Sequence, residues 1–458
     1  DAALDLGATT VTADATVSSG TGALGLGAVT LADGATLTLQ QGGSGSVTAA
    51  SVSGTAGGAA SDLTVNNTGV NTLGPVATDV GTVTITQSGG TTFTGPLTAG
   101  ALTVTDSQGL VDFQGSVDAT TVTVTDSQAG VRFGDTLDAG TVTLEDTADG
   151  ETVSFAGDTT VGTLTTAAQG YAVSLTGASN AITGDTTLLN TGSVTLGDGS
   201  GDATTFAGGL DTTGGPSGTA VAGTVATTDA ALDLGATTVT ADATVSAGTG
   251  GVTFAGTVDG ARDLVVNTTG VTTFAGAVGD TTALTSLTTD AGGSTVLAGG
   301  VLKTNGATIT FNDAVVLGAD AVITESGAGD VSFLSTVDSA DGANYTLSVN
   351  TQAGATIFGG PVGGDADPVG SPTDAGGLGG LTTDADGSTQ INTDTVTTTG
   401  GQSYGDAVTL GADATLTTGG GAGADVVFGS TVDGAQALTV DVDDGGAGDV
   451  DAQGAIGG

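Results

Sequence analysis

The chain has 458 residues, among them 85 glycines, and it contains no cysteine, histidine, methionine or tryptophan. Lysine and arginine number 3 against 49 aspartates and glutamates, which gives a formal net charge of −46. This composition excludes a disulfide scaffold, thiolate or imidazole chemistry, and the phosphate backbone of nucleic acids as a main partner. No run of 18 apolar residues occurs, so we expect no transmembrane segment.

The first residues already alternate apolar and polar side chains, which predicts short β-strands. The stretch DAALDLGATTVTADATVSSGTG at 1–22 returns at 229–250 with one change, Ser19 to Ala247. We therefore divide the chain into two repeat halves, 1–228 and 229–458, and expect the second to continue the first. The sequence opens and stops within repeats, so we expect a segment of a longer chain.

A shorter period of about 20 residues runs through the first half. TVTDSQ at 103–108 returns at 123–128, and four phenylalanines follow one another at spacings of 20, 20 and 22 residues: Phe93, Phe113, Phe133 and Phe155. Strands with period 2, separated by Asp, Ser, Gly and Gln, occupy each repeat. A chain in which inward-facing and outward-facing side chains recur with this period can form a coil, so that each turn lies on the previous one.

The second half contains edited copies of one module. VTFAGTVDG from residue 252 resembles VSFLSTVDS from 331 and VVFGSTVDG from 426, and SLTTDAGGST at 286–295 resembles GLTTDADGST at 380–389. One copy is longer by about ten residues and includes Pro368 and Pro372. Because proline and glycine break strands, we predict an inserted surface loop at 363–376.

These patterns predict an all-β fold, a right-handed parallel β-solenoid (β-helix) of about 20 residues per coil. The hand follows from the strong preference of parallel β crossovers for right-handed connections. No helical period is found. A sandwich would need hairpin turns, and the Asn-Gly pair occurs only at Asn305–Gly306.

The blocks GTVDGARDLVVNTTGVTTFAGAVG from 256 and QSYGDAVTLGADATLTT from 402 resemble giant β-strand-repeat surface proteins of Gram-negative bacteria, related in style to filamentous haemagglutinin-like adhesins. The resemblance covers nearly the whole chain, but its motifs are degenerate. It implies a secreted β-helical shaft, extracellular or at the cell surface, used in attachment or in surface layers.

Function is expected to come from length and surface, not from catalysis. The main reading is a non-catalytic shaft segment acting in adhesion; the alternative is a self-assembling structural protein of a fibre, sheath or surface layer. Expected partners are other copies, neighbouring segments of the same chain, or glycans and other cells. Polysaccharide cleavage by an Asp pair stays a weaker alternative, since no Asp group stands out from the corner residues. Ice binding by the stacked Thr103, Thr123 and Thr143 is a further alternative, but the neighbouring column of Thr105 and Thr125 ends at Glu145.

Acidic residues recur with the coil period. We expect Asp106, Asp126 and Asp146 to form one column about 4.8 Å apart, and Asp118 and Asp138 a second. Two like charges at that spacing repel by about 0.9 kcal/mol even in water. Calcium accepts carboxylate oxygens in flexible geometry, so these five residues are the candidate calcium ligands. Solvated corner aspartates screened by salt are the alternative.

Overall fold

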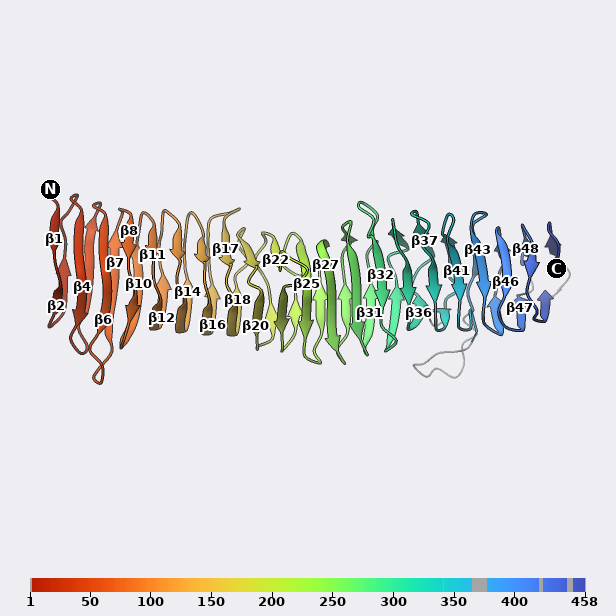
Figure 1. Ribbon diagram of the computed structural model, residues 1–458, viewed down its shortest axis with the longest axis horizontal. Helices are drawn as coiled ribbons and strands as arrows, with labels where there is room; N and C mark the ends of the chain where they lie inside the picture. Colours follow the sequence, from red (N-terminus) through yellow and green to blue (C-terminus); the bar gives the residue numbers. More distant parts are fainter. Residues whose placement is uncertain (1, 341, 365–376, 420–422, 443–447, 458) are drawn as a thin grey trace. The chain divides into compact units, whose positions relative to one another are not determined.

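The computed structural model describes residues 2–340, 342–364, 377–419, 423–442 and 448–457, and all regular elements in these ranges are β-strands. The chain divides into two compact units, Asp1–Ala226 and Thr227–Gly458. Each unit is a parallel β-solenoid in which strands of successive coils pair side by side (Figure 1). The all-β parallel solenoid predicted from the sequence is confirmed. In the described ranges no helix has the length and hydropathy of a membrane crossing.

The strands of the first unit are β1 (Leu4–Leu6), β2 (Thr9–Val11), β3 (Ala15–Val17), β4 (Leu24–Leu31), β5 (Thr36–Gly43), β6 (Val47–Gly54), β7 (Ser61–Asn67), β8 (Asn71–Leu73), β9 (Val76–Ala77), β10 (Val80–Gln87), β11 (Thr91–Phe93), β12 (Leu97–Val104), β13 (Val111–Phe113), β14 (Val117–Val124), β15 (Val131–Phe133), β16 (Leu137–Leu144), β17 (Thr152–Phe155), β18 (Thr159–Thr166), β19 (Ala172–Leu175), β20 (Ser179–Ile182), β21 (Thr186–Thr187), β22 (Val194–Leu196), β23 (Ala203–Phe206), β24 (Leu210–Asp211) and β25 (Thr219–Thr227).

Those of the second unit are β26 (Leu232–Leu234), β27 (Thr237–Gly248), β28 (Val252–Phe254), β29 (Val258–Asp259), β30 (Asp263–Thr268), β31 (Val271–Phe274), β32 (Ser286–Thr289), β33 (Ser294–Leu297), β34 (Val301–Thr304), β35 (Ile309–Phe311), β36 (Ala314–Leu317), β37 (Ala321–Glu325), β38 (Val331–Phe333), β39 (Val337–Ser339), β40 (Thr346–Asn350), β41 (Ala355–Phe358), β42 (Gly380–Thr383), β43 (Ser388–Ile391), β44 (Thr395–Thr398), β45 (Gln402–Tyr404), β46 (Ala407–Leu410), β47 (Ala414–Thr418), β48 (Val426–Phe428), β49 (Val432–Asp433), β50 (Leu438–Val442) and β51 (Val450–Ala452).

From β11 to β18, each coil of the first unit combines a short strand with a long bent one, such as β13 with β14. Burial alternates along β14 on both sides of Thr120 and Thr121, which are both exposed. Two successive outward residues reset the alternation, so one continuous strand turns a corner and lines two faces of the coil. The short strand lines the third face. The sequence pattern predicted separate strands here, because the break in phase looks like a strand end.

The coil length is 20 residues where the sequence repeat is clearest and varies elsewhere. Leu97 pairs with Val117, and Val117 with Leu137. In the second unit Thr346 pairs with Gly380, 34 positions later, whereas Leu381 pairs with Gln402, 21 positions later. The long coil contains the predicted inserted loop at 363–376, of which residues 365–376 lie outside the described residues.

The interior of the first unit is built from columns of matching apolar side chains. Four phenylalanine rings stack at centroid distances of 5.0, 5.0 and 5.2 Å with interplanar angles of 12° or less. Leu73 and Leu175 continue this column before Phe93 and after Phe155. The phenylalanine spacing in the sequence is therefore the register of the coils.

Candidate functional site

The predicted ligands Asp118 and Asp138 lie side by side on the outer face of β14 and β16. They are direct register partners, and both are exposed. Thr98 and Thr160 take the same position on the coils before and after. This column therefore offers two neighbouring carboxylates flanked by hydroxyl groups.

The predicted ligands Asp106, Asp126 and Asp146 lie at one corner of three successive coils, each two residues beyond the end of a long strand. Their carboxylates already have partners within the corner. The side-chain amides of Gln108 and Gln128 donate to Asp106 Oδ1 and Asp126 Oδ1, at 2.9 Å in both cases. The backbone N–H of Thr147 donates to Asp146 Oδ1 at 2.8 Å.

The five predicted ligands thus form the two columns expected from the sequence, on different parts of the coil. Within the ranges that the structure describes, no group of three or more acidic side chains is arranged to hold a metal ion. Calcium binding would have to use pairs such as Asp118 and Asp138, completed by neighbouring hydroxyl oxygens. It stays a prediction.

A second use of aspartate was not foreseen from the sequence. One carboxylate oxygen accepts a hydrogen bond of 2.8–3.3 Å from a backbone N–H of the following coil, 20 to 26 residues later. These capping aspartates are Asp14, Asp62, Asp158, Asp229, Asp242, Asp259, Asp320, Asp330, Asp413 and Asp425. A carboxylate on a backbone N–H is a charge-assisted hydrogen bond, so each one ties two coils together.

Small polar side chains also line the inside of one corner. Ser107 and Ser127, the serines of the TVTDSQ repeat, are fully buried, and their hydroxyls donate to the carbonyls of Gly109 and Gly130 at 2.6 and 2.8 Å. The buried Asn67 instead reaches the preceding coil, where its side-chain amide donates to the Gly45 carbonyl at 2.7 Å. In both copies of the repeat, the serine therefore provides a hydrogen-bond donor for a carbonyl of its own turn.

All three basic residues lie in described ranges and bond within their own chain. Arg132 Nη1 lies 3.1 Å from Asp112 Oδ1, its register partner on the preceding coil. Lys303 Nζ lies 2.6 Å from Asp280 Oδ1. Arg262 donates from Nε to the Thr240 carbonyl at 3.0 Å.

One outer face of the first unit has uncharged outward residues over five successive coils, between Asp62, the register partner of Thr82, and the exposed Glu145, two residues after Thr143. Its outward residues pair in register from β10 to β18 and are at least partly exposed. This threonine face consists of Thr82, Thr84, Ala101, Thr103, Thr121, Thr123, Thr141, Thr143, Thr163 and Thr165. The other two faces of the same coils carry the Asp118–Asp138 pair and the Asp112–Arg132 pair. The predicted stacking of Thr103, Thr123 and Thr143 is confirmed.

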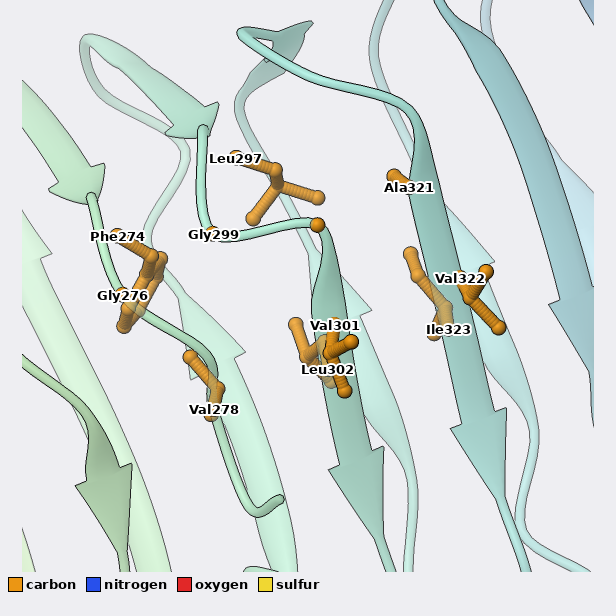
Figure 2. A pocket seen from close by; sticks show the side chains of 11 residues that line it. Phe274, Gly276, Val278, Leu297, Gly299, Val301, Leu302, Ala321, Val322 and Ile323 are labelled. Carbon is orange, nitrogen blue, oxygen red and sulfur yellow. The ribbon is translucent and has the colours of Figure 1, made fainter.

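Figure 2 shows the side chains that line a small apolar pocket in the second unit, where Phe274, Leu297, Leu302 and Ile323 are buried and Val322 is exposed. Its volume is about 10 Å³. That is the room of about one water molecule, so the pocket has no space for an organic substrate.

Comparisons with known proteins found no match among family models, curated proteins or solved structures. Function has to be argued from the coils and their outer faces.

Proposed function

We propose that the chain is a non-catalytic shaft segment of a large extracellular repeat protein that acts in adhesion or attachment at the cell surface. Support comes from the construction of each unit. Coil stacks on coil in register, and apolar columns fill the inside. In proteins built this way, function comes from the extended outer surface.

The threonine face is the observation that carries the adhesive role. In a chain with a net charge of −46, it offers partners a strip of uncharged side chains, bordered by the carboxylates of Asp62 and Glu145. A glycan matches it chemically, because hydroxyl groups exchange hydrogen bonds with hydroxyl groups in either direction. The adhesion partner proposed here is therefore an uncharged glycan on another cell.

The size of the face favours a glycan over a second copy of the chain. Five coils at about 4.8 Å spacing give a strip about 20 Å long and about 7 Å wide, measured over two threonines per coil. That area is far below the roughly 800 Å² per partner of a stable protein–protein interface. Two copies held by this strip alone would dissociate.

Binding of the purified chain to immobilised neutral polysaccharides tests the proposal. The variant Thr121→Asp/Thr123→Asp/Thr143→Asp places charges on the threonine face and should abolish binding. The variant Thr98→Asp/Thr160→Asp adds charge to the neighbouring face and should bind as the wild type does. Equal loss in both variants, or no glycan binding by the wild type, would overturn the adhesive role.

The alternative is a self-assembling structural protein of a fibre, sheath or surface layer. Negative-stain images of the purified chain separate the two functions. Ordered assemblies that persist in the threonine-face variant would establish the structural role, whereas single particles that bind glycans support adhesion.

A further inference from the structure

Two buried aspartates occupy equivalent places in the two copies of a module in the second unit. Asp313 precedes β36 and is 3% exposed; Asp406 precedes β46 and is 2% exposed. Both face inward at a corner, whereas the capping aspartates reach backbone groups near the surface.

In the first copy, two threonines of the preceding coil clamp the carboxyl group. Thr289 Oγ1, at the end of β32, donates to Asp313 Oδ1 at 2.7 Å. Thr295 Oγ1, on β33, lies 3.1 Å from Oδ1 and 2.8 Å from Oδ2 of the same residue. The three side chains join two neighbouring coils from the inside.

The second copy repeats this cluster with the same residue types. Thr389 Oγ1 donates to Asp406 Oδ1 at 2.7 Å, and Thr383 Oγ1 lies 3.3 Å from it. Asp406 Oδ2 is buried and has no hydrogen-bond partner. A negative charge on that oxygen would be uncompensated, which is costly in a buried place.

We propose that Asp313 and Asp406 are proton-operated clamps, which hold neighbouring coils together while their carboxyl groups are protonated and loosen them when these groups ionise. The clamps make the second unit respond to pH.

The surroundings of both groups disfavour ionisation. Burial, the largest effect, raises the pKa of Asp313 and of Asp406, and the hydrogen bonds from the threonines oppose it. The charges of Asp290 and Asp384, each directly after a clamp threonine, raise the two pKa values further.

No compensating cation comes from the packed strands. Strands β32, β33, β35, β36, β38, β42, β43, β45, β46 and β48 carry no charged residue, and burial raises the pKa of Tyr404 on β45, which keeps that phenol neutral. On the following coils, Asp338 and Asp433 occupy the outward positions of β39 and β49. Asp386 lies near Asp384 and raises its pKa, but burial raises it more.

The direction of the pH effect follows from these shifts. An aspartate in the unfolded chain titrates near pH 3.9, and the folded chain binds the same proton more tightly. The stabilisation is complete below about pH 4 and is lost as pH rises through the higher pKa of the folded state. Each pH unit within this window changes the opening equilibrium about tenfold per clamp.

Hydrogen exchange read by mass spectrometry tests the clamps in the full chain, with rates corrected for the intrinsic pH dependence of exchange. In the wild type, opening of β32–β36 and β42–β46 should rise steeply as pH increases from 4 to 8 at constant ionic strength. In the variant Asp313→Asn/Asp406→Asn, which mimics the protonated form, this rise should disappear. The single variant Asp406→Asn should lose it only in β42–β46.

The variant Asp433→Asn/Asp441→Asn is the matched control, because it removes the same charge from exposed positions of the same unit. It should keep the pH dependence of the wild type. If it loses that dependence too, or if the clamp variants keep it, the proposal is overturned. Greater opening of the clamp variants at every pH would also overturn it, because the carboxylates would then act as ionised clamps.

Discussion

At single positions, short polar side chains bond to backbone groups in two ways. Ser127 bonds to the Gly130 carbonyl within its own corner, whereas Asp158 accepts from the Ser179 N–H of the following coil. Both side chains are short and lose little rotamer freedom when they are ordered. A single hydrogen bond can therefore outweigh this entropy cost and stabilise the fold. Their effects can be separated by substitution.

Ser127→Ala should destabilise the first unit by about 1 kcal/mol, because the hydrogen bond to the buried Gly130 carbonyl is lost. The midpoint of urea unfolding measures this. Thr121→Ala, on the exposed face of the same coil, is the control and should change stability by less than about 0.5 kcal/mol. Equal effects would mean that the serine hydroxyl is not needed in the corner.

Asp158→Ala should also lower the unfolding midpoint, since the Ser179 N–H loses its acceptor at 2.9 Å. The carboxylate is exposed, so the expected cost is only about 0.5–1 kcal/mol. Asp158→Asn keeps an acceptor oxygen at the same place and should restore most of the loss. If the asparagine variant is as unstable as the alanine variant, the negative charge of Asp158, and not its acceptor oxygen, contributes the stability.

Among the strands, the buried aromatic column of the first unit should be sensitive to substitution. Phe133→Ala removes a ring stacked between two others and should cost about 3–5 kcal/mol. Phe133→Leu should cost less than about 1.5 kcal/mol, because leucine already fills this column at Leu73 and Leu175. Urea unfolding compares the two. Similar costs for both would mean that ring stacking itself, rather than filled volume, stabilises the column.

The strands were predictable wherever side chains of one kind recur at the coil period. The inward direction of Phe113 and Val124 is predictable from the sequence, because each alternates with polar neighbours. Ser107 and Asp406 do not, because serine and aspartate next to glycine are also the ordinary residues of exposed turns. Their direction depends on which carbonyl or hydroxyl the neighbouring coil presents, and this is known only once the coils are stacked.

Across the whole molecule, aspartate has three roles that differ with depth. Exposed pairs such as Asp118 and Asp138 repel each other, capping aspartates bind backbone N–H groups of the next coil, and the buried Asp313 and Asp406 favour their protonated form. Ionisation therefore stabilises the capping bonds while it loosens the buried clamps. The net charge of −46 adds repulsion that dissolved ions can screen.

Calcium should raise the thermal unfolding midpoint of the chain beyond a sodium chloride control of equal ionic strength. Both salts screen repulsion between exposed carboxylates, but only a divalent cation can bridge register partners such as Asp118 and Asp138. The variant Asp118→Asn/Asp138→Asn removes that pair and should reduce the calcium-specific increase. The variant Asp433→Asn/Asp441→Asn removes equal charge and should leave this increase unchanged. If both salts raise the midpoint equally in the wild type, screening alone is at work and these aspartates are not calcium ligands.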